Sequence, residues 1–114
     1  MAAKIIIADD EKAIRDTLKM VLEDEGYEIE SAADGEEALE KIKESNFDIA
    51  ITDIKMPKLD GISLLEKASQ ISPNTFFIVM TAYASVQTAI DALRQGAFDY
   101  LIKPVEFDDV ILRV

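Results

Sequence analysis

Residues 49–61 read Ile-Ala-Ile-Thr-Asp-Ile-Lys-Met-Pro-Lys-Leu-Asp-Gly, and this stretch decides the fold. The apolar run at its start is typical of a strand that is buried on both faces. The run ends on Asp53 and then breaks into a loop that contains Pro57 and ends at Gly61. A carboxylate at the tip of a buried strand is costly to desolvate unless something occupies the site with it. Taken alone, Asp53 is better explained as a cap of the next turn, so the case for a functional residue depends on the rest of the chain.

The composition limits both the size of the protein and its chemistry. The 114 residues are 49% hydrophobic and 31% charged, which is typical of one compact domain, so we expect residues 1–114 to form a single domain. Cysteine and histidine are both absent, so any bound metal must be held by oxygen. The net charge of -11 disfavours direct binding to nucleic acid or to anionic lipid. We expect a cytoplasmic protein, because the N-terminus lacks a signal-peptide core and no apolar run approaches the roughly 18 residues of a membrane span.

Hydrophobic periodicity predicts five strands that alternate with five helices. Continuous apolar runs predict central strands and alternating patterns predict edge strands. The expected central strands are 4–8, 48–52 and 75–80, and the expected edge strands are 27–32 and 98–102. The first helix is expected from Glu11, capped by Asp9 or Asp10 and ended by Gly26.

Apolar residues at helical spacing place the other four helices. Asp34 and Glu37 resemble a capping box at the start of the second helix. The remaining helices are expected from about Asp60 to before Ser72, from Ser85 to Gly96, and after Pro104. The last has only about nine residues, roughly two and a half turns, and we expect it to be cut short. This order predicts an α/β fold of the flavodoxin-like (βα)5 kind, a doubly wound parallel sheet with strand order 2-1-3-4-5.

Polar residues follow the carboxyl ends of four expected strands. Ligands of such sheets bind beyond those ends at the switch point, here between the first and third strands. Each residue alone has an ordinary explanation as a helix cap, a turn residue or a surface lysine. Their convergence on one edge nevertheless favours a shared site, made of Asp9, Asp10, Asp53, Thr81 and Lys103.

Three carboxylates, a hydroxyl and an ammonium group suit phosphoryl chemistry. Clustered carboxylates repel one another and call for a cation, and an all-oxygen ligand set that keeps waters suits Mg²⁺ or Mn²⁺. Lys103 would supply a positive charge and Thr81 a hydrogen-bond donor to phosphoryl oxygens. Asp53 could then attack phosphorus and become an aspartyl phosphate. Because carboxylates are ionised at neutral pH, this attack requires no general base.

Over essentially its full length, the chain resembles the receiver domain of bacterial two-component response regulators. The motifs that carry the resemblance are Asp9-Asp10, Asp53 with Met56-Pro57 and Asp60-Gly61, Thr81-Ala82, and Lys103-Pro104. The resemblance implies that Asp53 accepts a phosphoryl group from the phosphohistidine of a sensor histidine kinase. It also implies that Asp10, Asp53 and the backbone carbonyl of Lys55 ligate Mg²⁺, while Asp9 acts mainly through a metal-bound water.

The same resemblance implies a conformational switch. Thr81 and Lys103 would contact the phosphoryl group, and the Lys103-Pro104 peptide would be cis. Thr81 would move toward the phosphoryl group and Tyr100 would turn inward, although Tyr100 is equally readable as an ordinary edge-strand aromatic. The output would be a rearranged face formed by the fourth helix, fifth strand and fifth helix. The bulk of Lys55 and Tyr83 suggests slow autodephosphorylation.

The segments 81–87 and 96–104 look most like receivers of the nitrogen-regulation, sigma-54 activator type, which are joined to ATPase and DNA-binding domains. No GxxxxGK[ST] phosphate loop or basic recognition helix is present, so the output domain is expected to be absent from this chain. The implied partners are a histidine kinase, an attached or separate output protein that regulates transcription, and a second copy of the chain after phosphorylation.

The residues around Asp53 and after the first expected strand disfavour three alternatives to this phosphorelay role as a signalling phosphoacceptor. A phosphatase with an aspartyl-phosphate intermediate would need a second aspartate two residues after Asp53, where Lys55 stands. A phosphorylation-independent binding module would usually lose an acidic, threonine or lysine position, and all are present. A flavodoxin-like cofactor binder would need a Gly-rich or Ser/Thr-rich turn after the first strand, which is missing.

Overall fold

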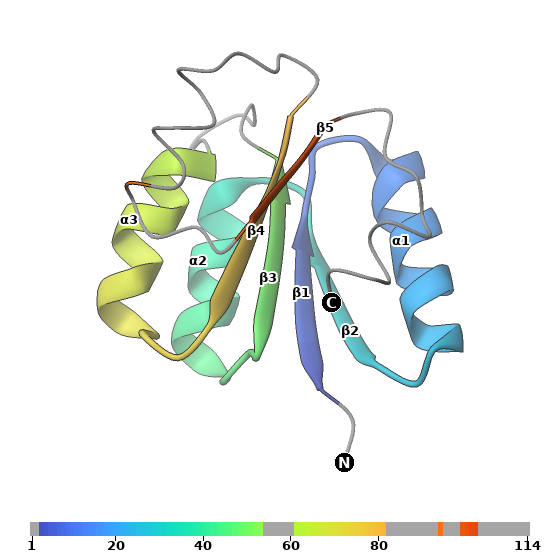
Figure 1. Ribbon diagram of the computed structural model, residues 1–114, viewed down its shortest axis with the longest axis horizontal. Helices are drawn as coiled ribbons and strands as arrows, with labels where there is room; N and C mark the ends of the chain where they lie inside the picture. Colours follow the sequence, from blue (N-terminus) through green and yellow to red (C-terminus); the bar gives the residue numbers. More distant parts are fainter. Residues whose placement is uncertain (1–2, 54–60, 82–93, 95–98, 103–114) are drawn as a thin grey trace.

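The computed structural model describes residues 3–53, 61–81, 94 and 99–102 (Figure 1). Within these residues, strands and helices alternate from the first strand to the fourth as the periodicity predicts, and a fifth strand follows. In order, the elements are β1 (Lys4–Ala8), α1 (Lys12–Asp24), β2 (Glu28–Ala32), α2 (Gly35–Glu44), β3 (Ile49–Asp53), α3 (Gly61–Ile71), β4 (Phe76–Thr81) and β5 (Asp99–Ile102).

The five strands form one parallel sheet in the order β2-β1-β3-β4-β5. This confirms the predicted order, with the continuous apolar strands in the centre and the alternating strands at the edges. Figure 1 shows α1 on one face of the sheet and α2 and α3 on the other. The described part of the chain is therefore a layered α/β fold of the flavodoxin-like kind.

Each face of the sheet has its own hydrophobic cluster. Ile5 and Ile7 of β1 face α1, where Leu18 and Leu22 are fully buried against them. The intervening Ile6 belongs to the other cluster, which packs against α2 and α3. Successive side chains of a strand point to opposite faces, so a strand covered on both sides needs apolar residues at every position. This explains why β1, β3 and β4 are continuous apolar runs.

The helix ends follow local chemistry, with one correction. The N-cap of α1 is Glu11, not Asp9 or Asp10, and its side chain makes no capping bond. The prediction was wrong because the helix starts one residue later: the Arg15 amide donates to the Glu11 carbonyl at 3.1 Å, while the Asp9 carboxylate accepts from the Glu11 amide at 2.9 Å. Gly26 has a φ of 96°, as predicted for the residue that ends this segment.

The second and third helices begin and end close to the expected positions. The Asp34 carboxylate accepts a hydrogen bond from the Glu37 amide at 2.8 Å, which confirms the predicted cap of α2. Helix α3 ends at Ile71, just before Ser72 and Pro73. Of the helix expected over 85–96 only Arg94 is described, and it is helical; the helix expected after Pro104 lies outside the described residues. Among the described residues, no helix is long and apolar enough to cross a membrane.

Candidate functional site

Four acidic side chains meet at the carboxyl end of β1 and β3. One carboxylate oxygen from each of Asp9, Asp10, Glu11 and Asp53 lies within 4.8 Å of the others. Asp9 is fully buried and Asp53 is 6% exposed, whereas Asp10 and Glu11 are exposed. Two members of the cluster are therefore buried inside the protein, and the other two face solvent on its open side.

The sheet register places the two buried acids side by side. Strands β1 and β3 are neighbours, and Ala8 pairs with Thr52. Asp9 and Asp53 are the next residues on these strands, so they reach the same level of the sheet. Parallel strands present their carboxyl ends at one edge, which is why residues far apart in sequence converge there.

Asp9 is held by hydrogen bonds to its amide, its carboxylate and its carbonyl. Its amide donates to the Ala32 carbonyl of β2 at 3.1 Å, and its Oδ1 accepts from the Glu11 amide at 2.9 Å. Its carbonyl accepts from Nη1 of Arg15 at 2.7 Å. On the neighbouring strand, the Thr52 hydroxyl donates to the Asp53 carbonyl at 3.0 Å. Asp53 is thus the last residue of a strand, and Asp9 directly follows a strand and is held to β2 and α1. Asp10 and Glu11 lie in the short connection to α1.

The chemistry of this donor set fits a hard divalent cation. Carboxylates this close repel one another, and a bound cation offsets that repulsion. Carboxylate oxygens are the preferred ligands of Mg²⁺ and Ca²⁺, and Mg²⁺ usually keeps several waters, which the open side admits. Cysteine thiolate and histidine imidazole ligands are absent from the sequence. The four carboxylates therefore form an acidic, all-oxygen site suited to a divalent ion.

The structure brings together three of the acids expected at the site and adds a fourth. Glu11 was missed because it reads as the start of a helix, although the run Asp9-Asp10-Glu11 was a visible signal of accumulated charge. Thr81 is the last residue of β4, one position beyond Met80, which pairs with Asp53.

The other expected site residues are placed less completely. Tyr100 lies in β5 opposite Val79, and its side chain is not described. Lys55, Lys103 and Pro104 lie outside the described residues, as does the Lys103-Pro104 peptide. The roles expected for these residues stay predictions.

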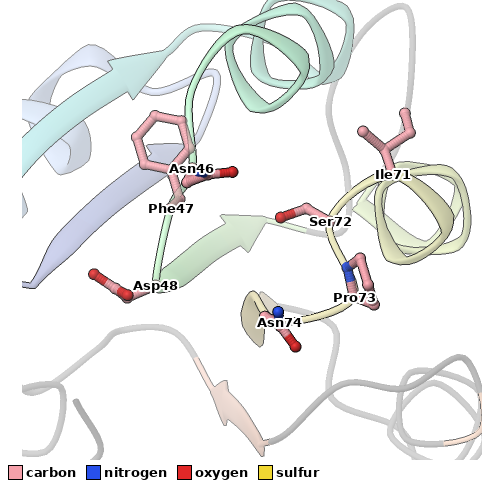
Figure 2. A pocket seen from close by; sticks show the side chains of 7 residues that line it. All are labelled: Asn46, Phe47, Asp48, Ile71, Ser72, Pro73 and Asn74. Atoms are coloured by element: carbon pink, nitrogen blue, oxygen red, sulfur yellow. The ribbon is translucent and has the colours of Figure 1, made fainter.

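A polar hollow of about 440 Å³ lies at the opposite, amino end of the sheet. Figure 2 shows its lining side chains, which come from the segment before β3 and from the connection between α3 and β4. Asp48 accepts from the Lys4 amide at 2.8 Å, and the Ser72 and Thr75 hydroxyls are 2.6 Å apart. These hydrogen bonds join neighbouring strands and turns at the amino end of the sheet. None of the residues that line the hollow belongs to the acidic cluster, which lies at the carboxyl end.

Comparison with known proteins gives the same family at the level of sequence and of structure. The model of the response regulator receiver domain matches residues 5–114. The transcriptional regulatory protein ZraR of Klebsiella oxytoca is 42% identical over 108 residues, which are 95% of this chain and 24% of that protein. The chain thus spans about a quarter of the length of this curated relative.

Two similar solved structures contain a divalent metal ion. A response regulator from Burkholderia pseudomallei with a phosphorylated aspartic acid, calcium ion and citrate has a TM-score of 0.90 at 29% identity, with coverage of 96% of this chain and 64% of that chain. The complex of CheX, CheY, BeF3 and Mg²⁺ from Borrelia burgdorferi has a TM-score of 0.93 at 35% identity, with coverage of 97% and 85%.

The family is that of signalling phosphoacceptors and not of classical enzymes, and its members interact with histidine kinases and partner proteins. The match covers almost the whole chain, and the fold and acidic cluster agree with it. This chain therefore belongs to the response regulator receiver domain family.

Proposed function

We propose that Asp53 is the residue that accepts the phosphoryl group. The observation that carries this proposal is the convergence of Asp53 with Asp9, Asp10 and Glu11 at the carboxyl end of the sheet. Asp53 is 6% exposed and lies beside Asp10 and Glu11, which are exposed. The phosphorylated aspartic acid of the Burkholderia pseudomallei relative supports the same chemistry here.

The proposed reaction is a transfer between two protein side chains. A carboxylate oxygen of Asp53 attacks the phosphorus of a phosphohistidine on a sensor kinase, and a P–O bond forms as the P–N bond breaks. The electron pair of the P–N bond stays on the imidazole nitrogen, and the histidine leaves as neutral imidazole once its ring holds one proton. Asp53 becomes an acyl phosphate, which water later hydrolyses.

The proposed metal is Mg²⁺, with Mn²⁺ as a substitute, held by Asp10, Asp53 and the backbone carbonyl of Lys55. When bound, such an ion supplies positive charge that offsets the negative charge of the phosphoryl group. Asp9 would act mainly through a bound water, consistent with its full burial. The Mg²⁺ in the Borrelia burgdorferi complex supports this choice of ion.

The proposed signal leaves the site through Thr81 and Tyr100. Thr81 and Lys103 would bind phosphoryl oxygens, with a cis peptide between Lys103 and Pro104. Thr81 ends β4 and Tyr100 belongs to the paired strand β5, so a movement at the site can pass to the neighbouring edge strand. The face formed by the fourth helix, β5 and the fifth helix would then act on an output partner.

The proposed biological role is phosphorelay control of transcription by one receiver domain that spans residues 1–114. The support is the similarity to ZraR, a transcriptional regulatory protein of which this chain matches 24%. An attached or separate output domain of the sigma-54 activator type, and a homodimer formed after phosphorylation, belong to the same proposal.

One experiment tests the proposed function directly. The protein is incubated with Mg²⁺ and a phosphorylated histidine kinase or a small phosphodonor, and the phosphoryl group is located by mass spectrometry. We expect label on Asp53 in the wild type and none in Asp53→Asn or after chelation of the metal. Absence of label on the wild type would favour a phosphorylation-independent binding module, and stable label on Asp53→Asn would place the acceptor elsewhere.

A further inference from the structure

Arg15 connects helix α1 to the acidic cluster. It lies in the first turns of α1, and its Nη1 reaches back to donate to the Asp9 carbonyl at 2.7 Å. The bond is partly buried. A hydrogen bond from a charged donor contributes more than a neutral one, so this contact is a strong local constraint.

The carbonyl that Arg15 binds belongs to the peptide that joins two of the clustered acids. Because a peptide unit is planar, fixing the carbonyl of Asp9 also fixes the amide of Asp10 and the direction in which the chain leaves toward it. Asp10 is exposed and has no surrounding packing to orient it as completely as Asp9. The bond from Arg15 therefore restricts the backbone orientation of both Asp9 and Asp10.

The bond also brings positive charge to the cluster without using its carboxylates. Its acceptor is a main-chain oxygen, so this contact takes up no oxygen of the four side chains. A cation paired directly with a carboxylate would compete with a metal ion for the same oxygen. An arginine bound to a main-chain carbonyl can hold the acids in place without itself occupying a carboxylate oxygen.

We propose that Arg15 is a positioning residue for divalent-ion binding, acting through the Asp9-Asp10 peptide. The inference rests on the proposed function, because it concerns the same metal site. It gives α1 a role in preparing the site in addition to its role in covering the sheet. Rigid support of this kind is what keeps a binding site in its productive geometry.

Two effects of removing Arg15 have opposite signs, which makes the proposal testable. Loss of the positive charge alone would leave the cluster more negative and strengthen cation binding. Loss of the positioning bond would leave Asp10 less well oriented and would weaken cation binding. We expect the second effect to dominate and Arg15→Met to weaken Mg²⁺ binding about 10-fold, which corresponds to about 1.4 kcal/mol.

The direct test is calorimetric titration of the protein with Mg²⁺ alone, together with the thermal midpoint of each variant in metal-free buffer. Lys12→Met is the matched control, because it removes one positive charge from the same helix but from a side chain that pairs with Asp16. We expect Lys12→Met to bind Mg²⁺ like the wild type. Arg15→Lys should recover most of the affinity, since one donor is enough for one carbonyl.

Unchanged or tighter Mg²⁺ binding by folded Arg15→Met would overturn the proposal. If Arg15→Met does not fold, Arg15→Gln serves as the neutral variant under the same criterion, compared with Arg15→Lys. The Mg²⁺ concentration for half-maximal labelling of Asp53 should rise with the calorimetric dissociation constant. Wild-type protein that neither binds Mg²⁺ nor accepts label would refute the proposed function itself, whereas normal wild-type behaviour with an unaffected Arg15→Met would refute only the role of Arg15.

Discussion

Charged groups are paired with opposite charges at the amino end of the sheet, whereas like charges are clustered at its carboxyl end. At the amino end, the Lys4 amide donates to Asp48, and the Lys4 ammonium lies 3.5 Å from Glu30 and 5.1 Å from the Phe47 ring centroid. At the carboxyl end, four carboxylates gather within 4.8 Å. One end joins opposite charges and ties strands together, and the other collects like charges around a site.

This contrast separates stability from function along the same strand. Asp48 directly precedes β3 and Asp53 is its last residue, so one strand carries a structural aspartate at one end and a candidate acceptor at the other. Sites that bind ions and phosphoryl groups accept unfavourable electrostatics in the unliganded protein. Substitutions at the two ends should therefore have opposite effects.

The largest expected difference is between Asp53→Asn and Asp48→Asn. Asp53→Asn should abolish phosphorylation, because an amide is not a nucleophile comparable to a carboxylate, and it should raise the free energy of unfolding in metal-free buffer by about 1 kcal/mol as one like charge is removed. Asp48→Asn should label normally and lose about 0.5–1.5 kcal/mol. Urea unfolding and mass spectrometry check both, and the contrast fails if both variants lose label.

The next largest effect is stabilisation by the divalent ion. At a free Mg²⁺ concentration 100 times the dissociation constant, binding should add about 2.7 kcal/mol to the free energy of unfolding. Asp10→Asn should lose most of this gain, and Asp48→Asn should keep it. Thermal unfolding with and without Mg²⁺ gives the comparison, and an equal gain in Asp10→Asn would show that the ion binds outside the cluster.

A moderate effect is expected from the buried hydroxyl at the amino end. Thr75 is 8% exposed, and its Oγ1 lies 2.6 Å from the Phe47 carbonyl. Thr75→Val should cost about 1–2 kcal/mol by leaving that buried carbonyl without its donor, with labelling unchanged. Thr17→Val, which removes an exposed bond to the Ala13 carbonyl, is the matched control and should cost much less. Equal costs would contradict a special role for the amino-end network.

The smallest effect concerns an exposed carboxylate on α1. The hydrogen bond from Lys12 lowers the pKa of Asp16 below its ordinary value of 3.8. A lowered folded-state pKa means that this contribution to stability is complete above pH 3.8 and is lost as the pH falls through the folded value. Lys12→Met should return the pKa of Asp16 toward 3.8, which NMR titration of the carboxyl group can detect. An unchanged titration would remove Lys12 as the cause.

The sequence was informative where burial and register decide the structure. The apolar runs around Ile6 and Ile51 predicted central strands because both faces are covered, and parallel pairing then predicted that Asp9 and Asp53 would meet. The cap of α1 was not predictable, because Asp9, Asp10 and Glu11 are all capable of starting a helix. The choice depends on tertiary contacts, namely the bonds from Asp9 to Ala32 and from Arg15 to Asp9.

The pairing of β1 with β3 also affects how the molecule folds. Between these strands the chain forms α1, β2 and α2, so β1 can pair with β2 before β3 has been added. Contacts between distant segments form late because closing the intervening chain costs entropy. Asp9 and Asp53 therefore come together only when β3 has joined the sheet. During refolding, Mg²⁺ affinity should therefore appear only after β3 has paired with β1, and a partly folded chain without that pairing would lack the acidic cluster.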